Sequence, residues 1–154
     1  MQAFCKMTLK RNFIRYWLPV VLGMGFIFWM STGTFSSQNT SSLIRTILCF
    51  LVPEISSPEV NLIHALLRKA AHVIEYFILG VLLFRAFRGG SNESFNWRWS
   101  LLSITVVVLW AASDEFHQLF VPTRTASAMD VGIDTAGGIF GQVVSAARYL
   151  YRLR

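Results

Sequence analysis

The chain has 154 residues, of which 54% are hydrophobic and only 14% are charged. Since a typical soluble domain carries about 25% charged residues, this composition argues against an ordinary soluble domain and favours an integral membrane protein. Two cysteines are too few for a disulfide framework, and the net charge of +6 indicates nucleic-acid binding only if the basic residues gather on one surface.

Four segments are predicted to cross the membrane, at about residues 16–32, 68–87, 99–120 and 131–150. A helix of roughly 20 mostly apolar residues is needed to span a bilayer core. The third segment is the most apolar and the fourth is the least, because it contains Asp134 and several glycines. The predicted fold class is therefore an all-α membrane protein, a four-transmembrane-helix bundle formed by a single domain over residues 1–154.

The first segment, YWLPVVLGMGFIFWMS, has Pro19 in its first turn, where the missing N–H of proline is tolerated. A cleaved secretory signal peptide is the alternative, because a basic region precedes the segment and small residues follow it. The run contains two tryptophans and is not followed by an A-x-A cleavage site, so we expect it to remain as a membrane span.

The stretch after the first span begins with polar residues at Thr32 and becomes apolar in LIRTILCFLV. This apolar piece is too short to span, so a short amphipathic segment in the first outer loop is expected to lie in the membrane interface or over the helices. Ser56, Pro58 and Glu59 then form a capping-box signal, from which a helix can run into the second span. His64, in this lead-in, is expected to face solvent or the interface.

The basic residues predict the orientation of the spans. Ten of the 14 Lys and Arg residues precede the first span, flank the connection between the second and third, or follow the fourth. Only Arg45, Arg68, Lys69 and Arg124 fall on the other side. Because positively charged segments stay in the cytoplasm, both termini are predicted to be cytoplasmic and the other two loops extracytoplasmic. The positive charge is thus a topology signal, and no nucleic-acid partner is expected.

With this topology, the ionisable residues of the spans gather at the outer leaflet. They are Lys69, His72, Glu75 and Tyr76 at the start of the second span, Asp114, Glu115 and Gln118 at the end of the third, Arg124 in the next loop, and Asp130 and Asp134 at the start of the fourth. Because charges that face lipid are costly, these side chains are expected to point into the bundle and to line a ligand-binding site.

A stripe of small residues continues from this polar end along the fourth span. Asp130, Asp134, Gly137 and Gly141 share one helical face, and the two glycines form a G-x-x-x-G motif. Glycines at this spacing let a neighbouring helix approach closely, so Gly137 and Gly141 are predicted helix-packing positions.

Four short motifs resemble those of the VanZ-like membrane proteins: K-x-x-H-x-x-x-Y in KAAHVIEY, D-E-x-x-Q in DEFHQ, P-x-R-x-x-S-x-x-D in PTRTASAMD, and D-x-x-G-x-x-x-G in DTAGGIFG. The resemblance covers about residues 31–141, and many members of the family carry Asn where this chain has Asp134. It implies a multi-pass protein of the bacterial inner (cytoplasmic) membrane, active in the cell envelope, with a link to teicoplanin-type antibiotic resistance. Some members are labelled phosphotransbutyrylases, but this sequence has no acyl-CoA or phosphate-loop signature.

The cations of the cluster suit an anionic group, because Arg124 offers a bidentate fork and Lys69 a point charge for phosphate or carboxylate. The predicted function is binding of an anionic lipid, cell-wall precursor or glycopeptide at the outer leaflet. The alternative is a small membrane enzyme acting on a phospho-lipid or polyprenyl-phosphate headgroup, with Glu75, Asp114 or Glu115 as the base.

Two other interpretations of the cluster are open. The charges can form a buried ion-pair network that only locks the helices together. His72 and Glu75 on one helix can also face Asp114, Glu115 and His117 on another as metal ligands, but the nearby lysine and arginine repel a cation, so neither a metal nor another cofactor is predicted. The sequence leaves the ligand, any turnover and the oligomeric state open.

Overall fold

The computed structural model describes residues 2–32, 37–89, 91, 95–122, 124 and 126–152, with side chains for 13–32 and 40–151 within those ranges. The elements of this described part are five helices, in the order α1 (Gln2–Ser31), α2 (Ser37–Leu51), α3 (Ser57–Arg88), α4 (Trp97–Gln118) and α5 (Ala128–Arg152). No strand occurs in the described ranges. The all-α class is therefore confirmed.

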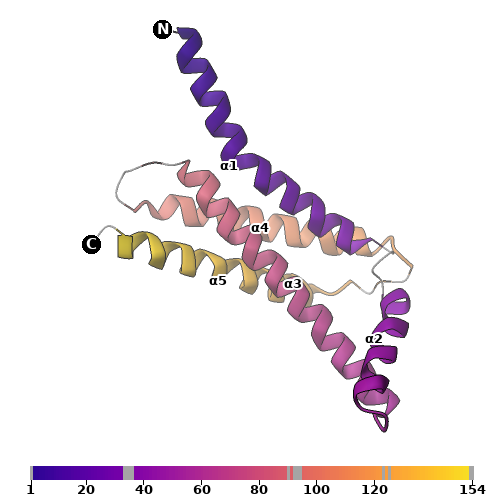
Figure 1. Cartoon of the computed structure of the whole chain (residues 1–154). Coiled ribbons are helices and arrows are strands. Elements are labelled where there is room, and N and C mark those ends of the chain that lie inside the picture. The colour runs from indigo at the N-terminus through magenta and orange to yellow at the C-terminus, as the bar shows by residue number, and fades with distance from the viewer. Residues whose placement is uncertain are drawn as a thin grey trace.

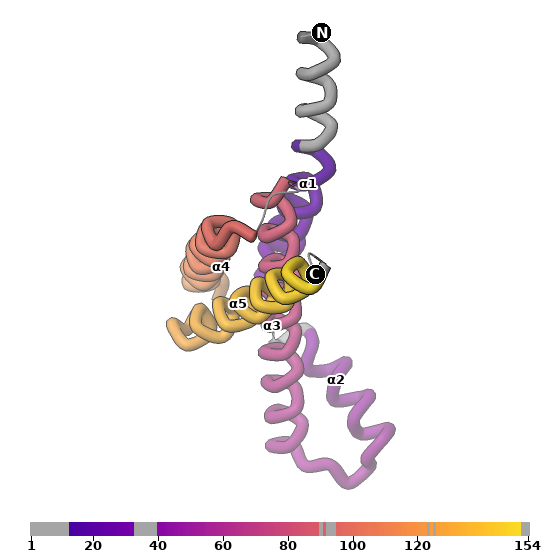
Figure 2. Tube along the Cα trace, turned by 90° about the vertical axis from the view of Figure 1, so that its left-hand side faces the viewer, coloured from indigo at the N-terminus to yellow at the C-terminus, as the bar shows by residue number. Residues whose placement is uncertain are grey.

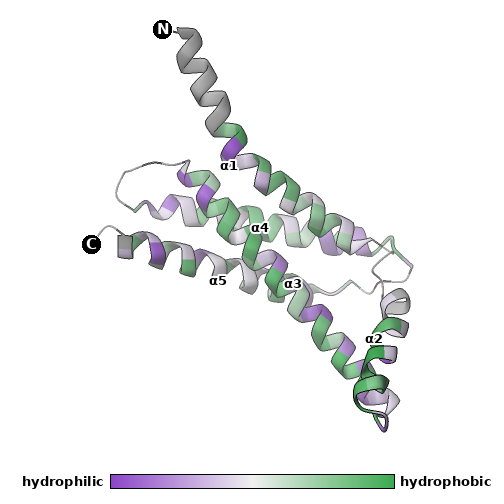
Figure 3. Ribbon diagram, viewed as in Figure 1, coloured by the Kyte–Doolittle hydropathy of each residue, from purple (hydrophilic) through white to green (hydrophobic). Residues whose placement is uncertain are grey.

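Three of the four predicted spans are helices long and apolar enough to cross a membrane: Phe13–Ser31, Ser57–Arg88 and Trp97–Gln118. α5 is less apolar, and its crossing stays a prediction. Large apolar side chains such as Leu22 and Leu109 are more than 60% exposed, whereas polar ones such as Ser103 are buried. This pattern, opposite to that of a soluble protein, indicates a multi-pass membrane protein. Figure 3 shows the long hydrophobic stretches on α1 and α3.

α3 is the central helix, because it contacts each of the other four. It packs most extensively against α5, and α1 and α4 cover its other sides (Figure 1). The apolar core joins Val20 and Ile27 of α1 to Leu79 of α3 and to Val107 and Ala111 of α4. α3 and α5 end at the same end of the bundle, where α4 begins (Figure 1).

Residues next to the helix ends explain the bounds of α3 and α4. The Ser56 N–H and Oγ–H both donate to Glu59 Oε2, at 2.9 and 2.7 Å, so the predicted helix start before the second span is confirmed. Gly89 follows the last residue of α3, and its φ of 59° is left-handed and favours glycine. Asn96 Oδ1 accepts the Arg98 N–H at 3.0 Å and caps α4.

The prediction that Pro19 lies in a first helical turn is wrong, because α1 begins at Gln2 and contains Pro19 in its interior. The preceding segment, QAFCKMTLKRN, is rich in good helix formers such as Lys, Leu, Met and Arg, and so it continues the helix. Proline here removes one backbone hydrogen bond, to the carbonyl four residues earlier. α1 belongs to the fold, since Val20, Ile27 and Ser31 are almost fully buried.

α2 forms the predicted segment of the first loop and lies beside the first half of α3, apart from the rest of the bundle (Figure 2). Thr40 Oγ1 of α2 and His64 Nε2 of α3 form a hydrogen bond of 2.9 Å. His64 is consequently 6% exposed. The expectation that His64 faces solvent or the interface is therefore wrong, because α2 covers it.

Glycines set the distance between α3 and α5. A Cβ added at Gly141 would meet the Phe77 carbonyl oxygen, and one at Gly137 would lie 2.6 Å from the Val73 carbonyl oxygen. From the other side, a Cβ at Gly80 would meet the backbone of Gly138. Backbone cannot yield as a flexible side chain can, so the two helices pack this closely only with glycine at these positions.

Candidate functional site

A pocket of about 330 Å³ lies where α3, α4 and α5 meet, at the end of the bundle nearest α2. It is lined by Ala65, Arg68, Lys69, His72, Glu115, Gln118, Ser127, Asp130, Ile133 and Asp134. Six of these ten residues belong to the predicted site: Lys69, His72, Glu115, Gln118, Asp130 and Asp134. The α3 wall carries the cations, and the α4 and α5 walls carry the carboxylates.

Two ion pairs join the α3 wall to the α5 wall. Lys69 Nζ lies 2.7 Å from Asp130 Oδ1, with 48% and 33% of the two side chains exposed. One turn deeper, His72 Nδ1 lies 3.6 Å from Asp134 Oδ1. The spacing follows from helix geometry, since 69 and 72 on α3 and 130 and 134 on α5 each lie about one turn apart. The expected pairing of a cation with an acidic residue across the helices is present.

Asp134 is the least hydrogen-bonded carboxylate of the pocket. Its side chain is 1% exposed, and neither of its oxygens has a hydrogen-bond partner among the described residues. His72, at 3.6 Å, is too far for a good hydrogen bond. Because buried polar groups are nearly always hydrogen-bonded, the free acceptors of Asp134 are positioned for a donor from outside the described chain.

Glu115 of α4 holds the end of the α4–α5 loop in place. Gln118 Nε2 donates to Glu115 Oε1 at 3.2 Å and lies 3.4 Å from Asp114 Oδ2. The other oxygen of Glu115 accepts the Ser127 N–H at 2.8 Å. Glu115 therefore fixes the start of α5 while it lines the pocket. Asp114 is 3% exposed and lies behind the pocket wall, where its Oδ1 has no hydrogen-bond partner among the described residues.

Arg124 lies between α4 and α5, as predicted, and contacts the end of α1. Its Nη2 donates to the carbonyl oxygens of Met30 at 2.6 Å and Thr32 at 3.2 Å, at the end of α1. Arg124 does not line the pocket. The last carbonyls of a helix lack intrahelical partners and carry a partial negative charge, so they are good acceptors for a guanidinium.

Arg124 also lies in the field of the polar cluster. Burial lowers the pKa of Arg124 from its ordinary value, the nearby Arg68 lowers it further, and Asp114 and Glu115 raise it. Arginine is the most basic side chain, so Arg124 stays charged at neutral pH despite this lowered pKa. Its role in the structure is to tie the α4–α5 loop to α1.

Glu75 and Tyr76, also predicted site residues, do not line the pocket. Tyr76 is completely buried in the core, and its hydroxyl has no hydrogen-bond partner among the described residues. Glu75 lies close enough to His72 and Asp114 to interact with them electrostatically. Both residues thus lie one layer below the pocket, on the side of the bundle interior.

Arg68 and Ser127 line the pocket but were not among the predicted site residues. Ser127 belongs to the quoted P-x-R-x-x-S-x-x-D motif, and that motif was the signal that could have revealed it. Its Oγ accepts the Met129 N–H at 3.2 Å and caps α5. Arg68 lies one turn before His72 on α3, and this i, i+4 spacing was the available signal.

A metal site is not assembled from the described residues, among which no group of three or more His, Cys, Asp or Glu side chains could hold an ion. His117, one of the five candidate ligands, lies against the Phe28 ring of α1, with the ring centroids 4.7 Å apart and the planes tilted by 41°. That contact points His117 away from His72 and Glu75.

Comparison with known proteins shows the family. The family model described as VanZ/LLP1 matches residues 16–149, which include the pocket and nearly the whole of the four candidate spans. The chain belongs to the VanZ/LLP1 family. No curated protein and no solved structure matches the chain significantly.

The four VanZ-like motifs meet at this one end of the bundle. KAAHVIEY supplies Lys69 and His72, whose partners Asp130 and Asp134 end PTRTASAMD and begin DTAGGIFG. DEFHQ supplies Glu115, which holds the backbone of Ser127. The motifs are far apart in the chain, yet each contributes a contact to the same pocket or to the loop that closes it.

Proposed function

We propose that this VanZ/LLP1 protein is a four-span membrane protein of the bacterial inner membrane that binds an anionic headgroup in the pocket at its outer end. α5 serves as the fourth span. Its 25 residues measure about 37 Å at 1.5 Å per residue, enough to cross a bilayer core. Its polar residues Asp134 and Gln142 are buried, while Phe140 and Val143 are exposed. The low mean hydropathy of α5 thus reflects a face turned toward the protein.

The proposed orientation follows from the charges. The end with Arg85, Arg88 and Arg148 faces the cytoplasm, as the ten-to-four division of basic residues requires, and the end with the pocket faces outward. Both termini are then cytoplasmic. Lys69 and Arg85 are about 24 Å apart along α3, somewhat less than a bilayer core of about 30 Å, and their long side chains can extend to the two faces of the membrane.

The two walls of the pocket favour a particular kind of headgroup. Arg68, Lys69 and His72 suit a phosphate or carboxylate, and Asp134 and Gln118 suit hydroxyl or amide donors beside it. Lipid-linked cell-wall precursors and acidic lipids with hydroxyl groups combine both features. A pocket of about 330 Å³ is at the small end of ligand sites, roughly 300–1,000 Å³, so it takes a headgroup and excludes a whole glycopeptide antibiotic.

A link to teicoplanin-type resistance would follow from binding of the precursor or membrane lipid and not of the drug. The observation that carries the proposal is Asp134, a fully buried carboxylate whose oxygens have no hydrogen-bond partner among the described residues, at the wall of a pocket with cations opposite. An ion-pair network built only for stability would satisfy those oxygens.

The test is binding of a polyprenyl phosphate, a lipid-linked wall precursor and teicoplanin to the purified protein, measured by native mass spectrometry. Lys69→Ala should weaken binding of the phosphate ligands by about 10–100-fold, the value of one hydrogen bond to a charged group. Arg45→Ala removes an exposed cation on α2, outside the pocket, and should leave binding unchanged. Equal binding by wild type and Lys69→Ala would contradict the proposal, as would preference for teicoplanin.

One observation favours the second candidate, a membrane enzyme acting on such a headgroup. A carboxylate without hydrogen bonds, 3.6 Å from an imidazole, is a suitable general base or acid. Incubation with polyprenyl phosphate derivatives or phospholipids, followed by mass analysis of the lipids, tests this. Headgroup release that Asp134→Asn abolishes without loss of binding would establish the enzyme. If the lipids are unchanged, the enzyme hypothesis is rejected and the binding function stands.

A further inference from the structure

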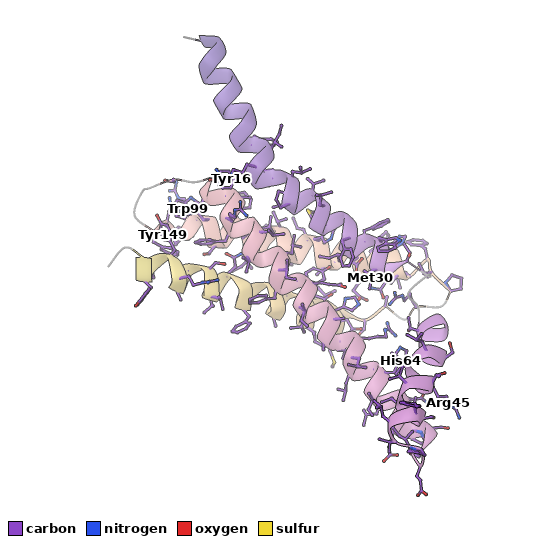
Figure 4. The ribbon with its side chains drawn as sticks, in the orientation of Figure 1. Tyr16, Met30, Arg45, His64, Trp99 and Tyr149 are labelled. Carbon is purple, nitrogen blue, oxygen red and sulfur yellow. The ribbon has the colours of Figure 1, made fainter. Side chains whose placement is uncertain are left out.

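A second, larger groove of about 710 Å³ lies between α3 and α5 at the other end of the bundle. Arg85 and Arg88 of α3 and Arg148 of α5 line it, and Phe77, Val81 and Val144 form its apolar part. Figure 4 shows Tyr149 at this end together with Tyr16 and Trp99, far from Met30 and His64 at the pocket end. The groove shares no residue with the pocket of Lys69.

The three arginines have no carboxylate within ion-pair distance among the side chains that the structure describes, where the ion pairs are Lys69–Asp130 and His72–Asp134. Arg85 instead lies over the Tyr16 ring at 5.5 Å, and Arg88 over the Tyr149 ring at 5.1 Å. Stacking on a ring positions a guanidinium and leaves most of its in-plane N–H donors available. Arg88 uses one of them at 3.3 Å on the Ser91 carbonyl oxygen.

Orientation of the protein alone does not explain this arrangement. Arginines that serve only as topology signals can lie anywhere near the ends of the spans. Here guanidinium groups from two helices converge on one groove. The groove extends from Arg88 to Phe77, about 16 Å along α3 at 1.5 Å per residue, and its far part is apolar. Cations at the membrane surface with an apolar channel beneath them match a phosphate group that carries an acyl chain.

We propose that this groove binds an anionic phospholipid, with its phosphate on Arg85, Arg88 and Arg148 and one acyl chain along Phe77, Val81 and Val144. Basic pockets between membrane helices bind acidic headgroups in this way, and the arginine fork fits two phosphate oxygens. Free phosphate shares the headgroup chemistry but does not use the apolar part. The site is independent of the ligand proposed for the outer pocket.

The experiment measures how phosphatidylglycerol, phosphatidylcholine and glycerol phosphate shift the Tm of the purified full chain in detergent. Phosphatidylglycerol should raise the Tm of the wild type, and the other two should not. Arg148→Gln, at an exposed position where folding is not at risk, should weaken the phosphatidylglycerol effect by at least about tenfold in the concentration required. Arg148→Lys should fall between, because it keeps the charge and loses the fork.

Two control variants make the result specific. Lys69→Ala in the outer pocket and Arg45→Gln on α2 should both leave the phosphatidylglycerol shift intact. A shift by glycerol phosphate equal to that by phosphatidylglycerol would show a site for soluble phosphate and overturn the lipid assignment. A phosphatidylglycerol shift that survives Arg148→Gln, or that Lys69→Ala removes, would overturn the location of the site.

Discussion

The two ends of the α3/α5 pair both carry several charged side chains but neutralise them differently. At the pocket end, a cation of α3 pairs with a carboxylate of α5: Lys69 Nζ lies 2.7 Å from Asp130 Oδ1. At the other end, Arg85 and Arg88 lie over aromatic rings, and no described carboxylate is within ion-pair distance. Between the two ends, the helices meet through glycine and backbone. One end thus holds complementary charges around a pocket, and the other presents cations to an anion from outside.

Loss of the close glycine contact between α3 and α5 should disturb both the pocket and the arginine groove, because both are formed between these two helices. Gly141→Leu would place a side chain against the backbone of Phe77, so we expect a cost at or above the upper limit of about 1–3 kcal/mol for overpacking. Thermal unfolding in detergent measures it. Gly132 of α5 is the matched control, since a Cβ there meets nothing within 4 Å. Equal Tm values for Gly141→Leu and Gly132→Leu would contradict the α3/α5 contact.

Arg124→Ala should affect only the pocket end. It removes the donor to the carbonyls of Met30 and Thr32, and hydrogen bonds from a charged donor contribute about 1.5–3 kcal/mol. Hydrogen exchange should speed up in the last turn of α1, and the Tm should fall. Arg45→Ala serves as control and should change neither. A Tm loss without any change in exchange at α1 would show that Arg124 acts elsewhere.

Asp134→Asn distinguishes a ligand site from a structural ion pair. If the carboxylate is kept for a ligand, the neutral amide should raise the free energy of unfolding by about 1 kcal/mol, because a buried charge without hydrogen bonds is removed. Headgroup binding should weaken in the same variant. A loss of stability of similar size would instead mean that the His72–Asp134 pair mainly holds the helices together.

The smallest effect on stability is expected for Lys69→Ala. The Lys69–Asp130 pair is partly exposed, so solvent screening limits its contribution to less than about 1 kcal/mol despite the short distance. Chemical denaturation measures this change, and the binding assay on the same sample should show the larger loss. A stability loss well above 1 kcal/mol, with binding intact, would show that the ion pairs of the pocket stabilise the fold and do not serve ligand binding.

Local sequence patterns, such as capping residues and helical spacing, predicted the start of α3 and the gathering of charged residues at one end of the bundle. The capping residues Ser56 and Glu59 mark the start of α3, and helical spacing with the charge-based topology predicts that Lys69 or Arg124 meets an acidic residue of α4 or α5, as Lys69 does. The exposure of His64 was predicted wrongly, and the contact of Arg124 with α1 was not predicted. The partners of Arg124 are backbone carbonyls, which have no sequence signature, and His64 is covered by α2, whose position depends on tertiary packing. Arg68 was missed although its i, i+4 spacing to His72 places the two residues on one face of α3, the face that lines the pocket.

Sided labelling along α5 tests the central claim, that the two polar ends lie on opposite faces of a membrane. In a chain with Cys5 and Cys49 replaced by Ser, single cysteines are placed at Ala128 and at Tyr151, exposed residues near the two ends of the helix. A membrane-impermeant maleimide added to intact spheroplasts should label Ala128→Cys at once and Tyr151→Cys only after the membrane is opened. Labelling of both from outside, or of neither, would contradict a membrane-spanning α5 and the outward-facing pocket that depends on it.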